Sequence, residues 1–377
     1  MLFSQVLGQK TVQAQLLRMV QSDRLPHALL LLGPQGVGKR TLALALAQYV
    51  LCEAPESTDA CGNCRSCRSV AGLKHPDLHF SYPTAGTNAI SEHFIDAWRT
   101  RMEESPYFDV FDWIKTIGKE SNQGNITKDE CVNIVRKLSL KAFMGKRKIL
   151  VMWLPEFLGK EGNRLLKLIE EPPDDTLFIL LAENPERILP TILSRCQIVR
   201  VGPIDDAEVS EGLQRIKGML PEQADTTALL ADGNFHLALQ LAANQENNYA
   251  DLFVEWLRAC HQNSGIGWVK IAERIAELGR EPQKYLITYG LHFLREALIL
   301  SLTDQLPPRL RGQQLVTAQK LMSAGLDAER IEGMSALLSE SHYHVERNAN
   351  AKVLFVNTSI RLHRIMRQPV EAWARTR

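Results

Sequence analysis

A glycine-rich stretch at residues 33–40, Gly-Pro-Gln-Gly-Val-Gly-Lys-Arg, constrains this chain more than any other feature. It follows the phosphate-binding pattern G-x-x-x-x-G-K-[ST] up to the last position, where Arg40 replaces the hydroxyl residue. In that pattern, backbone N–H groups and the lysine hold phosphates, and the hydroxyl holds Mg²⁺. The phosphate-holding groups are present, as Gly33, Gly36, Gly38 and Lys39. The stretch predicts the strand–loop–helix unit of an ATPase that has lost a metal-binding group.

A second ATPase element lacks its metal-handling groups as well. Residues 148–152 form an apolar run after a basic loop, which predicts a buried parallel strand. In a working ATPase the end of such a strand carries acidic residues that position Mg²⁺ and water. Here Trp153 and Leu154 follow, and Glu156 comes only after a proline. Thr41 does not replace the missing hydroxyl, because one residue along a helix turns the side chain by about 100°. Nucleotide binding stays open, but independent hydrolysis is not expected.

Composition narrows the class of protein. The chain has 377 residues, 45% of them hydrophobic, which is enough for two or three domains with sizeable cores. The formal net charge of +1 gives no global field that would attract nucleic acid or a membrane. The apolar stretches are too short to span a bilayer, and the N-terminus lacks a signal-peptide pattern. We expect a soluble cytoplasmic protein.

Four of the seven cysteines are clustered, at Cys52, Cys61, Cys64 and Cys67. Two-residue gaps let successive thiolates converge on one tetrahedral ion, and four thiolates make a closed structural zinc site. An iron–sulfur cluster also uses thiolates, but the usual spacing and trailing proline are missing. Four free cysteines in a loop are the simpler alternative. The spacing favours structural Zn²⁺.

The hydrophobic pattern alternates between strands and helices as far as residue 202. Such alternation around a phosphate loop implies a parallel sheet with helices on both faces. Strands are predicted at 28–32, 78–82, 148–152, 176–181 and 198–201, and helices at 10–22, 41–51, 126–140 and 161–171. After Gly202-Pro203 only helical periodicity is seen. We predict an α/β domain at 1–202 with a zinc module at 52–67, a small helical domain at 203–243 and an all-α domain at 244–377.

Residues 83–125 interrupt the α/β alternation and carry Trp98, Phe108, Phe111 and Trp113 among polar residues. Exposed aromatic side chains can stack on nucleic-acid bases. An insertion that packs its aromatics against the protein itself is the simpler explanation, and we favour it.

Two further motifs carry a family resemblance. Residues 163–173, Asn-Arg-Leu-Leu-Lys-Leu-Ile-Glu-Glu-Pro-Pro, resemble the helix of bacterial clamp-loader ATPases that ends in Leu-Glu-Glu-Pro-Pro. Residues 192–196, Ile-Leu-Ser-Arg-Cys, resemble the Ser-Arg-Cys motif of the same proteins. The four-cysteine insertion after the first helix of the ATPase core is shared as well. Together these matches cover most of residues 1–240, and they place the chain near the AAA+ clamp-loader subunits of bacterial DNA polymerase III.

The departures from the family point to a subunit type. ATP-hydrolysing subunits keep both metal-handling motifs, a small polar sensor at a strand end and a lid arginine on the nucleotide. This chain has Arg40, Trp153-Leu154, Ala182-Glu183 and His236 at those places. The pattern resembles the delta prime type, a rigid end piece of a pentameric ring. The insertion at 83–125 does not match the family.

The resemblance implies a role in loading the sliding clamp on primer–template DNA. It implies motor subunits and a delta-type subunit as partners, with the C-terminal helices in the collar of the ring. It also implies that Arg195, between Ser194 and Cys196, reaches into the ATP site of the adjacent motor subunit. An arginine suits that task because it stays charged and offers a planar fork of donors to a phosphoryl group. The simpler alternative is that Arg195 pairs with a carboxylate of its own chain.

Two other functions stay open. The chain could be an active ATPase, as the motor subunit of the same loader, if Thr41 and Glu156 replaced the missing groups. It could also be a zinc-dependent DNA-binding module, although balanced charge and the lack of a recognition-helix pattern argue against that.

Overall fold

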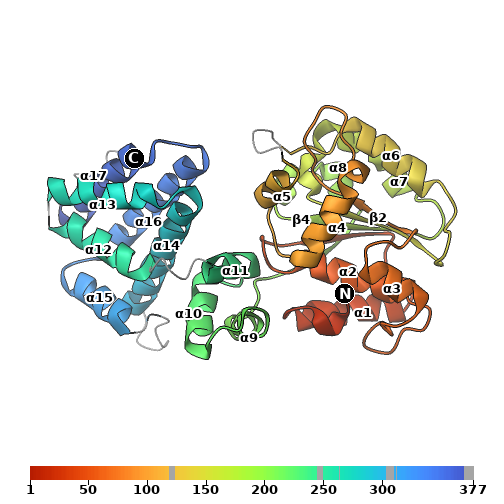
Figure 1. Cartoon of the computed structure of the whole chain (residues 1–377), viewed down its shortest axis with the longest axis horizontal. Helices are drawn as coiled ribbons and strands as arrows, with labels where there is room; N and C mark the ends of the chain where they lie inside the picture. The colour runs from red at the N-terminus through yellow and green to blue at the C-terminus, as the bar shows by residue number, and fades with distance from the viewer. Residues whose placement is uncertain (119–123, 244–248, 263, 303–309, 311, 369–377) are drawn as a thin grey trace. The chain divides into compact units, whose positions relative to one another are not determined.

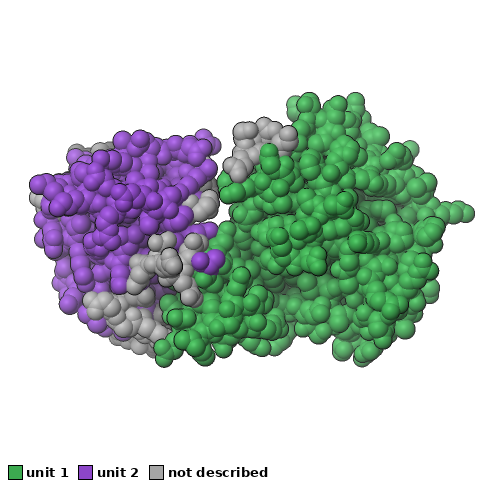
Figure 2. All heavy atoms as spheres, viewed as in Figure 1, with its two compact units in different colours: residues 1–242 green, residues 243–377 purple. Residues whose placement is uncertain are grey.

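The computed structural model describes the chain except residues 119–123, 244–248, 263, 303–309, 311 and 369–377 (Figure 1). Its contacts divide it into two compact units, Met1–Ala242 and Ala243–Arg377 (Figure 2). The first unit holds the sheet, the four cysteines and a group of three small helices. The second unit is helical throughout its described residues.

A five-stranded parallel sheet forms the centre of the first unit, in the order β2-β3-β4-β1-β5. The strands are β1 (Ala28–Leu32), β2 (Leu78–Ser81), β3 (Lys148–Trp153), β4 (Thr176–Ala182) and β5 (Gln197–Arg200). β1, β3 and β4 are buried along their whole length, as the continuous apolar runs predict. The predicted parallel sheet is confirmed, and every strand end lies within one residue of its predicted position.

Helices cover both faces of the sheet, so side chains of β1 alternate between two cores. Leu29 and Leu31 pack in the core with α1 (Lys10–Gln21) and α2 (Lys39–Leu51). Ala28, Leu30 and Leu32 pack in the opposite core with α6 (Lys128–Leu138), α7 (Asn163–Glu170) and α8 (Pro190–Leu193). α6 begins at the predicted cap, where the Thr127 hydroxyl accepts the N–H of Glu130 at 3.1 Å. This layering leaves the phosphate loop at the carboxyl end of β1, between β4 and β5.

The predicted insertion is a folded part of the first unit. It contains α4 (Ile95–Glu104) and α5 (Val110–Thr116), and Thr84 pairs with Asn125 where it leaves and rejoins the body. Trp98 and Trp113 are fully buried, and Trp98 stacks on Tyr82 with ring centroids 4.1 Å apart. The expectation that the insertion packs its aromatics on its own body is confirmed for these residues. Residues 119–123 of the insertion lie outside the described residues.

Three helices follow the sheet in the first unit: α9 (Asp206–Lys217), α10 (Pro221–Ala231) and α11 (Phe235–Ala243). We call them the lid. Their core contains Val209, Leu213, Ala228 and Phe235, and two residues from elsewhere, Leu7 and Tyr107, are buried in it. A residue of the insertion is therefore part of the core of the lid.

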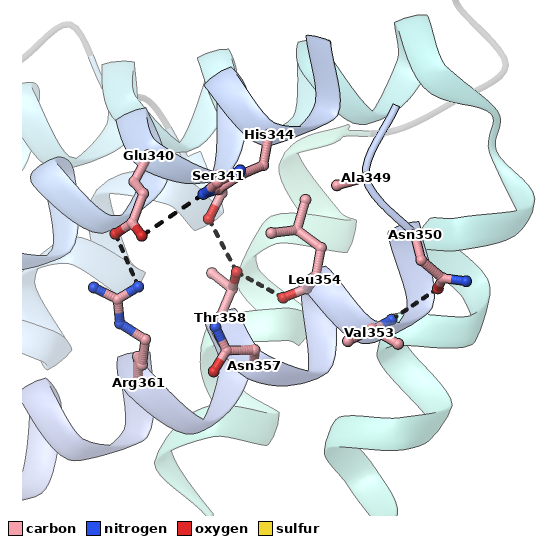
Figure 3. Close-up of a pocket in the computed structure, with 10 residues that line it drawn as sticks. All are labelled: Glu340, Ser341, His344, Ala349, Asn350, Val353, Leu354, Asn357, Thr358 and Arg361. Carbon is pink, nitrogen blue, oxygen red and sulfur yellow. Dashed lines mark hydrogen bonds and ion pairs between the residues drawn. The ribbon is translucent and has the colours of Figure 1, made fainter. Parts of the chain in front are cut away.

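The second unit is built from long helices: α12 (Tyr249–His261), α13 (Gly265–Glu277), α14 (Arg280–Leu302), α15 (Gly312–Ser323), α16 (Ala328–Glu346) and α17 (Ala351–Arg367). Two of these helices are joined by a buried hydrogen bond, in which Trp256 Nε1 of α12 donates to Ser359 Oγ of α17 at 2.8 Å. A hollow of about 310 Å³ lies between α16 and α17 (Figure 3). The Glu340–Arg361 ion pair, at 2.8 Å, lines it. Among the described helices, none has the length and apolar character needed to cross a membrane.

The remaining helical pieces are short: η1 (Phe3–Gln5), α3 (Arg65–Ala71), η2 (Ser91–Phe94), η3 (Pro155–Phe157), η4 (Gly159–Gly162) and η5 (Pro185–Arg187).

Candidate nucleotide and subunit-contact sites

The glycine loop has the backbone shape that the sequence predicts. Gly36 and Gly38 have φ of 74° and 88°, a left-handed conformation that glycine adopts without strain. Gly38 directly precedes α2, so the loop opens onto a helix N-terminus. The loop–helix geometry that binds anions is therefore present.

Lys39 is turned onto its own loop. Its ammonium donates to the carbonyl oxygens of Gly33 at 2.7 Å and Pro34 at 2.5 Å, and lies 3.9 Å from Glu183. The side chain is 5% exposed, and burial lowers the pKa of Lys39 to about 8, an effect that the Glu183 carboxylate partly offsets. Groups of the protein satisfy the ammonium that would otherwise bind phosphate.

Arg40 occupies the place of the metal-binding hydroxyl and reaches into the insertion. Its guanidinium carbon lies 3.6 Å from the ring centroid of Phe108 and 4.4 Å from that of Trp153. Its Nη2 donates to the carbonyl of Phe108. Burial lowers the pKa of Arg40 to about 9, so the group is still charged at neutral pH. The arginine therefore makes cation–π contacts with two aromatic rings.

Thr41 and Glu156, the two candidates to replace the missing metal-binding groups, both form hydrogen bonds with the backbone instead. The Thr41 hydroxyl donates to the Gly38 carbonyl at 2.7 Å and is buried, one turn inside α2. Glu156 Oε1 accepts the N–H groups of Glu183 and Asn184, at 2.5 and 2.8 Å. Glu156 thus orders the turn after β4, and the Thr41 hydroxyl is bonded to the backbone at the start of its own helix. Neither arrangement gives a Mg²⁺ ligand beside the loop.

The lid lies directly on the loop. The N–H of Phe235 donates to the Gly36 carbonyl at 3.1 Å. Asn234 leaves no room for a side chain at Gly36, because a Cβ atom there would lie 1.7 Å from Asn234 Oδ1. His236 is 5% exposed and has its Nδ1 3.2 Å from the carbonyl oxygen of Tyr107. Because a carbonyl only accepts, Nδ1 carries the proton.

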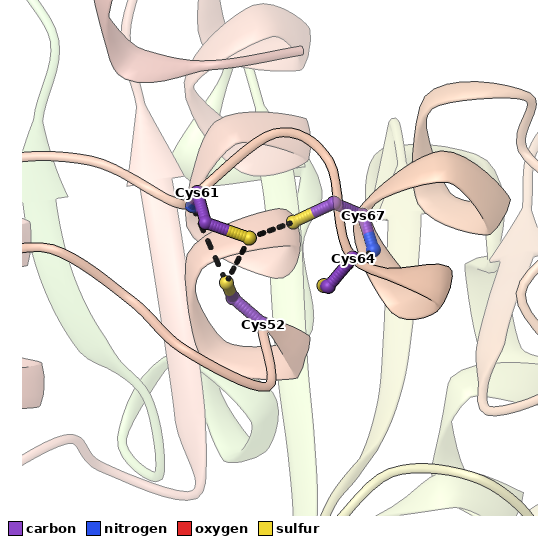
Figure 4. A group of neighbouring side chains, drawn as sticks. All are labelled: Cys52, Cys61, Cys64 and Cys67. Carbon is purple, nitrogen blue, oxygen red and sulfur yellow. Dashed lines mark hydrogen bonds between the residues drawn. The ribbon is translucent and has the colours of Figure 1, made fainter.

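The four cysteines converge as predicted (Figure 4). Their sulfur atoms all lie within 4.8 Å of one another, with Cys52–Cys61 at 3.5 Å and Cys61–Cys67 at 3.9 Å. Four sulfurs about 2.3 Å from one zinc ion would be spaced by roughly 3.8 Å. Backbone N–H groups of Asn63 and Cys64 lower the pKa of the Cys61 thiol to about 7, whereas burial raises the pKa of the Cys52 and Cys67 thiols. The donor set and its spacing fit a tetrahedral ion.

Arg195 follows α8 on the other side of the sheet from the insertion. Its Nη1 donates to the Thr191 carbonyl at 2.7 Å and to Ser194 Oγ at 3.2 Å, and its Nη2 pairs with Glu170. The side chain is one-third exposed. Cys196 packs at the edge of the neighbouring core, where burial raises the pKa of its thiol to about 11. The carboxylate partner in the same chain, which the sequence left as an alternative, therefore exists.

Sequence reasoning missed Tyr107, Phe108 and Asn234 at the loop, and Glu170 beside Arg195. Phe108 contacts Arg40 from 68 positions away, and no periodicity connects the two. One signal was available: a buried arginine after a phosphate loop requires an acceptor or an aromatic face, and the insertion is rich in aromatics. Glu170 lies within the motif helix that was already noted.

Comparison with known proteins assigns the family. The sequence model of the family described as "DNA polymerase III, delta subunit" matches residues 8–205, more than half of the chain. "DNA polymerase III subunit delta'" of Pseudomonas aeruginosa is 31% identical over 57% of this chain and 55% of its own length. The protein of the same name in Escherichia coli is 29% identical over 59% of this chain and 56% of its own length. The chain thus spans a little over half the length of these curated relatives.

A solved gamma subunit-related DNA polymerase III protein from Thermotoga maritima covers 94% of this chain at 15% identity, with a TM-score of 0.41. That likeness is weak, and the fold follows from the order and direction of the strands in the sheet. The family match and the relatives agree, and the chain belongs to the DNA polymerase III delta subunit family, with delta' subunits among its relatives.

Proposed function

We propose that this chain is the delta' subunit of a clamp loader that serves a bacterial DNA polymerase III. In this role the chain does not hydrolyse ATP. It is a fixed part of the ring that loads a sliding clamp on primer–template DNA. Its partners are the motor subunits and a delta-type subunit, and its second unit joins the collar. The names of the relatives support the assignment to the polymerase.

The observation that carries the proposal is the state of the phosphate loop. Lys39 bonds to its own loop, Arg40 stacks on Phe108 and Trp153, and Glu156 bonds to the turn after β4. An ATPase needs Mg²⁺, a positioned water and a free lysine at the phosphates. Among the described residues at the loop, Lys39 is bonded to carbonyl oxygens, and neither Arg40 nor Glu156 is placed to hold Mg²⁺ or to position a water. An active motor subunit, the main alternative, has no support in this geometry.

Arg195 supports the second half of the proposal, the arginine supplied in trans. It is charged, one-third exposed and held at two of its nitrogens, so its orientation is fixed before a partner arrives. Fixed donors stabilise the charge of a transferring phosphoryl group without reorganisation cost. The Glu170 pair is compatible with this role because surface ion pairs are worth only about 0–1 kcal/mol and can rearrange.

We further propose that the four cysteines hold one structural Zn²⁺. Cys52 and Cys61 flank the loop at 52–61, and Cys64 caps α3, accepting the N–H of Cys67 at 3.3 Å. With four protein ligands the ion would have no open position, so it would carry no chemistry. The cysteine module then serves folding rather than DNA recognition.

Assembly tests the proposal most simply. The chain is mixed with the motor and delta-type subunits of its own organism, and complex mass and ATP hydrolysis are measured with clamp and primed DNA. We expect a defined complex whose stimulated hydrolysis requires this chain. Failure to join the complex, or equal hydrolysis without it, would contradict the proposal. Salt-sensitive binding of the isolated chain to primed DNA would instead favour the DNA-binding alternative.

A further inference from the structure

We propose that residues 106–112 of the insertion act as a built-in substitute for nucleotide. The segment occupies the space above the phosphate loop and ties the loop to the lid, the two parts that a bound nucleotide would connect. The chain then takes no nucleotide, and its lid keeps one position. This deepens the proposed function, since it gives a physical reason for a fixed subunit, but it does not depend on Arg195.

On the loop side, the segment fills the site. Phe108 accepts a hydrogen bond from Arg40 through its carbonyl and covers the guanidinium with its ring. The space left between the loop and the segment is about 20 Å³, lined by Gly36, Gly38 and Lys39 of the loop, and by Tyr107, Phe108 and Trp153. Ligand sites of nucleotide size need about 300–1,000 Å³. The remaining space holds no more than one water molecule.

On the lid side, the preceding residue is part of the lid core. Tyr107 is buried, and its ring meets that of Phe235 edge-on with centroids 4.8 Å apart. Its carbonyl accepts the Nδ1–H of His236. Two adjacent residues therefore make the connection, with the Tyr107 ring packed in the lid core and Phe108 on Arg40 of the loop.

Two carboxylates strengthen the connection. Asp112 and Asp109 lie 3.5 and 3.9 Å from His236 Nε2, the nitrogen that faces away from Tyr107. Burial lowers the pKa of His236, and burial together with Asp109 raises the pKa of Asp112. At these distances the imidazole and the two carboxyl groups interact electrostatically. The histidine thus meets the insertion through both of its ring nitrogens.

The covalent attachment of the segment gives it an advantage over a free ligand. Tethering keeps its local concentration far above that of a dissolved nucleotide, so it is not displaced by mass action. A lid that responds to nucleotide changes its position when the nucleotide is bound, hydrolysed or released. A lid held by its own chain does not.

The test uses the full chain and has two parts. The first titrates wild-type protein with a fluorescent ATP analogue and Mg²⁺. We expect no saturable binding up to about 1 mM nucleotide. A Kd of 1 mM corresponds to a binding free energy of roughly −4 kcal/mol. A Kd well below that limit would overturn the inference, and it would leave the role of Arg195 untouched.

The second part measures hydrogen exchange of the lid. Phe108→Ala and His236→Ala each remove one contact of the segment, and Phe143→Ala is the matched control because Phe143 is 83% exposed and outside the site. We expect amides of 235–243 to exchange ~10-fold faster or more in both variants, with β1 and β4 unchanged. Unchanged lid exchange in a folded Phe108→Ala or His236→Ala protein would overturn the inference. If neither variant folds, the wild-type titration decides it alone.

Discussion

At the scale of single residues, Arg40 shows how one substitution changes the use of a whole motif. A hydroxyl at this position binds Mg²⁺, whereas a guanidinium must find acceptors and aromatic faces. It finds them in Phe108 and Trp153. The sequence predicted the loss of the metal ligand from the residue type alone. It did not predict the new contacts, because they depend on how a distant insertion folds.

Restoring the hydroxyl is therefore expected to cost stability without restoring activity. Arg40→Thr removes cation–π contacts worth about 0.5–2 kcal/mol each, so the midpoint of thermal unfolding should fall. ATP hydrolysis should stay at the level of a buffer blank, because the strand end still presents Trp153 and Leu154. Calorimetry and a steady-state ATPase assay check both halves. Turnover by this variant would show that the strand-end groups are dispensable.

A second prediction at this scale concerns Glu170, which pairs with Arg195. If Glu170 only orients Arg195, Glu170→Ala should lower the stimulated ATPase of a reconstituted loader by up to ~5-fold, the value of a surface ion pair. Adding it to Arg195→Ala should cause no further loss, since the two act through one group. Glu161→Ala, which removes the Glu161–Arg164 pair at the start of α7, is the control. Additive losses in the double variant would contradict the positioning role.

At the scale of elements, the sequence predicted what local patterns determine. The buried strands β1, β3 and β4 come from continuous apolar runs, and α6 starts at the hydroxyl of Thr127. The convergence of four cysteines followed from their spacing. For the insertion, the sequence predicted only that its aromatic side chains are buried. It did not predict the positions of Tyr107 and Phe108, because these depend on contacts with the lid and with Arg40.

At the same scale, the module of four cysteines is predicted to hold zinc. The purified chain should carry about one zinc per monomer and no iron chromophore, measured by elemental analysis and absorbance. Chelation should increase hydrogen exchange at 52–67 and leave the amides of β1 and β4 protected. Cys131→Ser is a fair control for the metal content, because that cysteine is buried in another core. Protein that is folded and holds no stoichiometric metal would refute the site.

At the scale of the whole molecule, the proposed function makes this chain a subunit that works only with its partners. The net charge of +1 gives no general attraction to DNA, so contact with DNA is expected through the assembled ring. The isolated chain should hydrolyse ATP no faster than a buffer blank, and Lys39→Ala should change nothing. Robust hydrolysis that Lys39→Ala abolishes would mean that the chain is a motor subunit.

The most direct test of the central claim is the ATPase of a reconstituted loader, stimulated by clamp and primed DNA, with Arg195→Ala in this chain. The account predicts that the complex assembles normally and that hydrolysis and clamp loading fall. Arginines supplied in trans are worth about 10³–10⁵ in rate at their own site, and the other sites of the ring limit the total loss. Arg195→Lys should rescue poorly, because a point charge does not reproduce the planar fork. Wild-type hydrolysis with Arg195→Ala in the complex would contradict the account and leave Arg195 as a partner of Glu170 alone.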